Sequence, residues 1–275
     1  MNFAPVLCLL LGNAEPSWLN DYDQAVETAL RDKKDLVVLF QQNGELDDVV
    51  GNVEVQKRLA NFVCLKLPVS YKYNDKPLLE YSALEDMMRK PGLTIISYHD
   101  NKLPTHGYVI SAHPLVGSRY RWVPGYGVEE VKAILGLPAY ACLSQRSMLY
   151  AITVHPERPQ SILSEVHPAF LKHAESHSQR QAQSQQQHHA NLGAAMNWLS
   201  SQVGVGMGGG SEVVAESWGR VVGGENVLEA AFSCLDAWRG SSGHWGSVSR
   251  QHRYCGYDMA RGANGTWYAT GIFAR

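Results

Sequence analysis

Two uninterrupted apolar runs constrain this chain most, because each directly follows a segment with the periodicity of a helix. Apolar residues recur at helical spacing through residues 18–34, and residues 35–40 then read Asp-Leu-Val-Val-Leu-Phe. A second helical segment at 53–60 leads to Phe-Val-Cys-Leu-Lys-Leu at 62–67. Short apolar runs of this length predict buried strands. The sequence therefore predicts an α/β fold in which helices precede strands.

The same alternation continues to residue 137. This order of elements resembles the thioredoxin-like fold over residues 17–137, and the sequence of residues 18–40 is similar to that of thioredoxin-like domains in secreted bacterial proteins. Pro91 either takes the cis-proline position of that family or is an ordinary proline at the start of a strand. The further predicted elements are a helix at 78–88, a strand at 91–98, a turn at 100–102, a hairpin strand at 107–111 and a short helix at 129–135.

The residues that would carry redox chemistry differ from those of the family. Where thioredoxin-like domains have Cys-x-x-Cys after the first core strand, this chain has Gln-Gln-Asn-Gly-Glu-Leu-Asp-Asp at 41–48. Dithiol exchange requires a thiolate. The resemblance therefore implies a thioredoxin-like domain at 15–137 that is redox-inactive. Because the whole chain lacks Cys-x-x-Cys, a zinc ribbon built from neighbouring cysteines is excluded too.

The first residues predict export. An apolar run at 3–11 is followed by Gly12-Asn13-Ala14, which satisfies the small-residue rule of a cleavage site. We therefore expect residues 1–14 to be a signal peptide and the protein to be secreted or periplasmic. The alternative is a buried N-terminal strand, since the run contains Pro5 and no Lys or Arg precedes it. The run is far shorter than the roughly 20 residues of a membrane span, so we expect none.

Composition bounds the remaining function classes. A length of 275 residues favours two domains, each large enough to bury its own core. The chain is 45% hydrophobic and 18% charged, with a formal net charge of -2, as in an ordinary globular protein. We expect no nucleic-acid partner, because no basic stripe is present. Removal of residues 1–14 would leave four of the five cysteines, whose pairing the sequence leaves open.

A proline-containing segment at 138–165 predicts a linker, with a short helix or strand at 144–153 that braces the two domains. His173 and His177 have the spacing of a metalloprotease pair but lack its Glu, so we expect them to be exposed polar residues. Beyond the linker we predict helices at 168–187, 190–203 and 225–238, a flexible glycine-rich loop at 204–210, and a closing hairpin of 254–259 with 266–273 around Asn264-Gly265.

The motif Trp-Arg-Gly-Ser-Ser-Gly-His at 238–244 carries the second resemblance. With histidines after a long helix and a closing hairpin, residues 166–275 resemble the bacterial form of the CAP superfamily (cysteine-rich secretory proteins, antigen 5 and pathogenesis-related 1). The resemblance implies an αβα sandwich. The glycines around His244 are predicted to turn the chain sharply so that this histidine faces a polar cleft, although a helix-capping role for His244 remains open.

The resemblance also implies site residues. His244 matches the cleft histidine of the family, and either His188 or His189 matches the other histidine. Glu216 matches the family's glutamate, with Glu225 as the alternative, and the second cleft glutamate of the family has no counterpart. Trp245 and Ser242 are expected to form the cleft wall. Two imidazoles and a carboxylate would suit zinc with one open position, or a polar ligand without metal.

These residues favour a binding or interaction protein whose cleft takes a metal ion, a small polar ligand or a cell-envelope component. The alternative is a metal-assisted hydrolase in which His188 and His244 hold zinc and Glu216 activates water. Binding is favoured because the sequence offers no nucleophile with a paired base.

Overall fold

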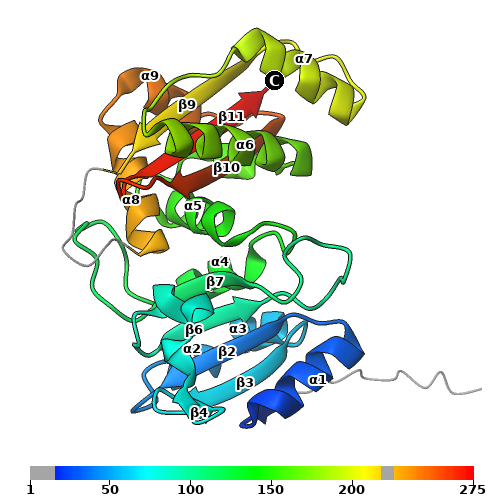
Figure 1. Cartoon of the computed structure of the whole chain (residues 1–275), viewed down its shortest axis with the longest axis vertical. Coiled ribbons are helices and arrows are strands. Elements are labelled where there is room, and N and C mark those ends of the chain that lie inside the picture. Colours follow the sequence, from blue (N-terminus) through cyan, green and yellow to red (C-terminus); the bar gives the residue numbers. More distant parts are fainter. Residues whose placement is uncertain (1–15, 218–225) are drawn as a thin grey trace, which may run out of the picture.

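The computed structural model describes residues 16–217 and 226–275, which form two β-sheets stacked along the long axis of the molecule (Figure 1). We call residues 16–137 the N-terminal unit and the described residues from 138 onward the C-terminal unit. The chain is a mixed α/β protein, as predicted, with both parallel and antiparallel strand pairs. The expected signal peptide at 1–14 and Glu225 lie outside the described residues.

The N-terminal sheet has the strand order β1-β3-β2-β6-β7. The two apolar runs form its neighbouring parallel strands β2 and β3, with Leu36 opposite Val63, which confirms the predicted strands. β6 and β7 continue the sheet in antiparallel pairing. The strands are β1 (Trp18–Leu19), β2 (Leu36–Gln41), β3 (Val63–Pro68), β6 (Gly92–Ile96) and β7 (Val109–Pro114), beside a small hairpin of β4 (Lys72–Tyr73) and β5 (Lys76–Pro77).

Local sequence sets the limits of the helices in this unit. Asp21 accepts a hydrogen bond from the Gln24 N–H where α1 begins, and Lys33 in the left-handed region ends that helix. The single helix predicted at 78–88 is wrong: two short 3-10 helices occupy most of it, and Leu84 is non-helical. The peptide bond before Pro91 is trans. The helices are α1 (Tyr22–Asp32), α2 (Asp47–Val50), α3 (Val53–Leu59), η1 (Leu78–Glu80), η2 (Ser82–Met87) and α4 (Val128–Gly136).

The C-terminal sheet has the order β8-β10-β11-β9, with α6 and α7 on one face and α5 and α8 on the other (Figure 1). Gly256 in β10 lets α6 lie close, because a Cβ there would come within 2.3 Å of the Phe170 backbone. The strands are β8 (Glu165–Val166), β9 (Gly210–Glu216), β10 (Tyr254–Arg261) and β11 (Trp267–Ala274). The helices are α5 (Leu143–Val154), η3 (Gln160–Leu163), α6 (Pro168–Ser184), α7 (Leu192–Val203), α8 (Val227–Arg239) and α9 (Ser242–Val248).

The segment expected to be a linker contains a buried helix rather than a free connector. All eight residues at 145–152 in α5 are buried. The helix packs against α8 and β10 of the C-terminal unit and against β7 of the N-terminal unit. One apolar cluster consequently runs from β2 through α5 to α8. The brace that we predicted at 144–153 is therefore a core element shared by both units.

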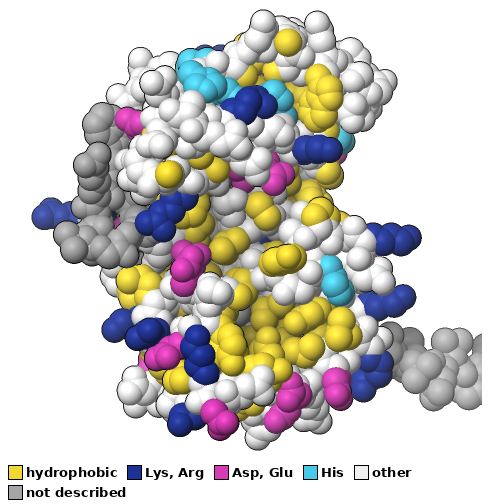
Figure 2. Space-filling model, viewed as in Figure 1, with side chains coloured by type: hydrophobic (Ala, Val, Ile, Leu, Met, Phe, Trp, Pro, Cys, Tyr) yellow, Lys and Arg dark blue, Asp and Glu magenta, His cyan; other side chains and the backbone are white. Residues whose placement is uncertain are grey.

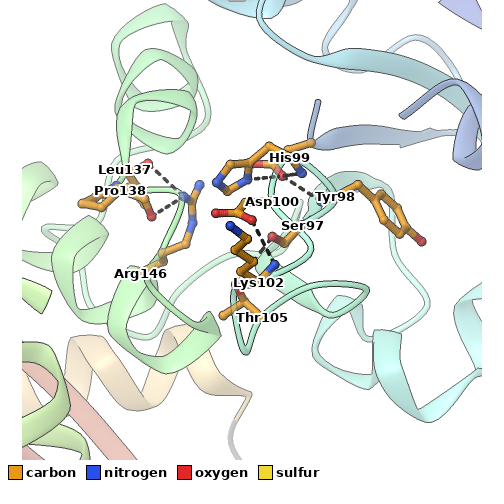
Figure 3. Close-up of polar contacts among 10 residues, drawn as sticks. Ser97, Tyr98, His99, Asp100, Lys102, Thr105, Leu137, Pro138 and Arg146 are labelled. Atoms are coloured by element: carbon orange, nitrogen blue, oxygen red, sulfur yellow. Dashed lines mark hydrogen bonds and ion pairs between the residues drawn. The ribbon is translucent and has the colours of Figure 1, made fainter. Parts of the chain in front are cut away.

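Arg146 fixes α5 to the N-terminal unit, as Figure 3 shows for two of its contacts. Its guanidinium donates to the carbonyls of Leu137, Pro138 and Ile134 at 2.9, 2.9 and 3.0 Å. Its Nε donates to Ser111 Oγ at 2.7 Å. Because α4 ends at these carbonyls, the side chain satisfies acceptors that a helix C-terminus leaves free.

A second polar contact joins the units at the start of α8. Asp86 in η2 accepts a hydrogen bond from the Val227 N–H at 2.7 Å. A carboxylate at this position suits the partial positive charge of a helix N-terminus. None of the helices in the described part of the chain has the length and hydropathy that crossing a bilayer requires.

Candidate functional site

Histidine side chains gather at the top of the molecule in Figure 2. They come from α6, from the turn after it and from α9, and β9 adds an acidic side chain. The residues are His173, His177, His188, His189, Glu212 and His244.

His189, Glu212 and His244 form one part of this group, which we call the histidine–glutamate cluster. His189 Nδ1 lies 3.1 Å from Glu212 Oε1, which also accepts a hydrogen bond from the Ala190 N–H at 2.8 Å. The rings of His189 and His244 are 5.9 Å apart between centroids. The structure thus brings together one histidine of the predicted pair, His244 and a carboxylate.

His188 is itself exposed, but it contacts the buried His177. Its carbonyl accepts a hydrogen bond from His177 Nε2 at 2.8 Å, and its ring lies 5.1 Å from the His177 ring. His177 is 1% exposed and Arg180 donates to its Nδ1, so the ring is held in its neutral form. The expectation that His173 and His177 are solvent-exposed is wrong for His177. His177 instead supports the turn that carries His188 and His189.

Burial sets the protonation of several of these rings. It lowers the pKa of His177 and of His173 from the ordinary histidine value. It lowers the pKa of His244 as well, with a smaller contribution from the neighbouring His189. At neutral pH the His244 ring is therefore uncharged and can both donate and accept a hydrogen bond.

The carboxylate of the cluster is Glu212, not Glu216. Glu216 pairs with Tyr268 at the far end of β9, four residues and about 13 Å along the strand from Glu212. The strand itself was missed: the predicted loop ends at Gly210, and no element was predicted over 211–216. The alternation Ser-Glu-Val-Val-Ala-Glu at 211–216 was the signal, since it places Glu212 and Glu216 on the face opposite Val213 and Ala215.

The residues predicted to hold a metal are not arranged for it. Across residues 16–217 and 226–275, no group of three or more His, Cys, Asp and Glu side chains is placed to bind a metal ion. His188 turns to His177, and Glu212 pairs with His189, whose ring in turn lies beside that of His244. The zinc set of His188, His244 and Glu216 is therefore not assembled here, and we derive no step through a metal.

The predicted cleft wall is also different. Trp245 packs on His155 at 4.9 Å between ring centroids, and its Nε1 donates to Glu157 Oε2 at 3.0 Å. It therefore binds α9 to the end of α5. Ser242 is the exposed first residue of α9.

The glycines around His244 do not make the sharp turn that we expected. Gly240 at the end of α8 has a right-handed helical conformation, with φ of -69°. Gly243 and Gly246 lie within α9, and a Cβ at either would meet nothing within 4 Å. His244 is thus presented by a short helix rather than by a flexible loop.

Asp258 is a buried acid of the C-terminal unit that hydrogen-bonds two serines. It is 2% exposed under α6, where Ser144 Oγ donates to its Oδ1 at 2.6 Å and Ser178 hydrogen-bonds its other oxygen. Burial raises the pKa of the Asp258 carboxyl to about 7.

The chain matches no protein-family model and no curated protein. Support for a function therefore comes from the sequence motifs and from the geometry described above.

Proposed function

We propose that this protein is a binding protein of the cell exterior or periplasm, in which the histidine–glutamate cluster takes a small polar ligand or a component of the cell envelope. The export part of the proposal is supported by the apolar run and Gly12-Asn13-Ala14 at the start of the chain. The resemblance of 238–244 to the CAP superfamily supports the binding part. The N-terminal unit contributes no dithiol chemistry, because residues 41–48 contain no cysteine.

The observation that carries the proposal is the pair of neighbouring rings, His189 and His244, of which His189 is held by Glu212. Its Oε1 accepts two hydrogen bonds, but its Oε2 is buried and has no partner among the described residues. A buried acceptor without a donor costs about 1–3 kcal/mol. Because Oε2 is closed to solvent, a ligand on the surface contacts the His189 and His244 rings, and Glu212 orients the His189 ring through Oε1.

The exposed ring of His189 completes the recognition surface. Its side chain is 55% exposed, whereas the Glu212 side chain is 3% exposed. A ligand can therefore reach the His189 imidazole, while the carboxylate behind it stays closed to solvent. Polar ligands with several hydroxyl or amide groups, such as cell-wall sugars and short peptides, match this mixture of donors and acceptors.

The test is a titration of the full chain with soluble peptidoglycan fragments, followed through the imidazole NMR signals of His189 and His244. We expect saturable shifts of these two signals, with His252 in the last loop unchanged. Glu212→Gln should weaken binding at least tenfold. Glu216→Gln, on the same strand and the same face, is the matched control and should bind normally. Equal effects of the two substitutions, or shifts spread over all histidines, would contradict the proposal.

A further inference from the structure

Both units line an open cavity of about 750 Å³. We call it the inter-unit cavity. The N-terminal unit supplies β7 and the loop before it, and the C-terminal unit supplies α5, α6 and the start of α8. Cavities of roughly 300–1,000 Å³ between domains are typical places for small-molecule sites.

The walls of the inter-unit cavity are apolar and aromatic. Ile110 and Met259 are buried, and the rings of Tyr108, Tyr140 and Trp267 line the opening. Tyr108 is 68% exposed, which leaves a large aromatic surface uncovered. Flat rings of a ligand can pack on such side chains with substantial burial of apolar area.

Ser144 is one of the polar residues that line the cavity. Ser144, at the start of α5, gives its hydroxyl hydrogen to Asp258 at 2.6 Å and lies 3.2 Å from the Cys142 sulfur. Because that hydrogen is committed, Ser144 Oγ can act only as an acceptor toward a ligand. Burial raises the pKa of the Cys142 thiol to about 11, so this cysteine is a neutral lining residue and not a nucleophile.

Charge at the opening is balanced. Lys172 and Glu175, both on α6, line the same cavity with opposite charges. A second, larger cavity of about 930 Å³ lies between α4, α5 and the loop after α5, and it is lined by Arg58, Glu129 and several other charged residues. The inter-unit cavity is therefore the one of these two that suits an uncharged ligand.

We propose that the inter-unit cavity binds a small, neutral, largely aromatic molecule that carries one N–H or O–H donor directed at Ser144. The site is separate from the histidine–glutamate cluster and belongs to both units. It follows from the aromatic walls, the volume, the balanced charges and the acceptor that Ser144 presents.

N-phenyl-1-naphthylamine, a neutral two-ring-system probe with one N–H, tests the proposal. Its fluorescence should rise and saturate when the full chain is titrated. Leu103→Trp fills the cavity from the loop before β7 and should weaken probe binding at least tenfold. Leu163→Trp is the matched control, because Leu163 is 65% exposed in η3 and lies outside the lining of this cavity. It should bind the probe normally.

Tyr108→Ala decides the question if Leu103→Trp does not fold. The exposed Tyr108 ring has little part in the core, so the variant should keep the thermal stability of the parent while binding the probe at least threefold more weakly. An absence of saturable binding overturns the proposal. So does equal affinity of the Leu103→Trp and Leu163→Trp chains, or unchanged affinity of Tyr108→Ala.

Discussion

His113 and Arg146 are buried where the N-terminal unit meets α5, whereas in the C-terminal unit the carboxyl of Asp258 is buried under α6. Burial lowers the pKa of His113 to about 3 and of Arg146 to about 10, and it raises the pKa of Asp258 to about 7. The physical cause is the same in both regions, since burial disfavours the charged form. The consequence for stability is opposite: acid weakens the first region and base weakens the second.

The two regions also satisfy their buried groups differently. Arg146 remains charged and meets three carbonyls and a hydroxyl, whereas Asp258 meets two serine hydroxyls and becomes neutral near pH 7. A guanidinium cannot lose its charge in the physiological range, so its environment must be built to hold it. A carboxyl can lose its charge by taking up a proton, so its environment needs fewer hydrogen-bond partners.

Removal of the buried cation should have the largest effect. Arg146→Met leaves the carbonyls at the end of α4 without donors, and we expect a loss of about 3–5 kcal/mol in the free energy of unfolding. Chemical denaturation of the full chain measures this loss. Arg250→Met, at an exposed arginine, is the control and should change stability by less than about 0.5 kcal/mol. A loss of similar size in both variants would contradict the role given to Arg146.

The second-largest effect is expected from removal of the buried acid, which should change the pH dependence of stability. The folded pKa of Asp258 lies above its ordinary value, so folding favours the protonated form, and stability falls as pH rises from about 4 through 7. Asp258→Asn should abolish this fall, which amounts to about 3–4 kcal/mol between pH 4 and pH 8. Denaturation midpoints at several pH values give the slope. Parallel slopes for parent and variant would show that Asp258 is not the group responsible.

His113 should give a pH dependence of the opposite sign. Its folded pKa lies below its ordinary value, so the unfolded chain binds the extra proton and stability falls as pH drops below about 6.5. Between pH 6.5 and 4.5 this contributes about 2 kcal/mol. His113→Phe keeps a ring between Tyr126 and Tyr150. It should remove this fall in stability at acidic pH, measured in the same denaturation series. His188→Gln, at an exposed histidine, is the control. If both substitutions changed the loss of stability at acidic pH, His113 would not be the group responsible.

The smallest expected effect on stability comes from substitution of a glycine in α9, the helix that carries His244. Gly246→Ala should stabilise the protein by about 0.5–1 kcal/mol, because this glycine is helical and its Cβ would meet open space. Gly265→Ala, at a φ of +82°, should destabilise it instead. Thermal unfolding compares the two. Destabilisation by Gly246→Ala would restore the view that His244 needs a flexible segment.

Much of the fold was predictable because its signals are local. The runs at 36–40 and 62–67 are buried strands, and the closing hairpin at Asn264-Gly265 pairs Tyr254 with Ala274. The candidate site was less predictable. His244 and both histidines at 188–189 were named, but Glu212 was missed because no strand was predicted over 211–216.

The sequence by itself determined the apolar periodicities, the turn residues and the absence of a dithiol motif, since each depends on neighbours along the chain. Only the tertiary structure decided that His189 rather than His188 meets His244, that Glu212 rather than Glu216 is their carboxylate, and that α5 is core rather than linker. These choices depend on which surfaces exclude water when distant segments pack. Spacing along the chain carries no direct record of that packing.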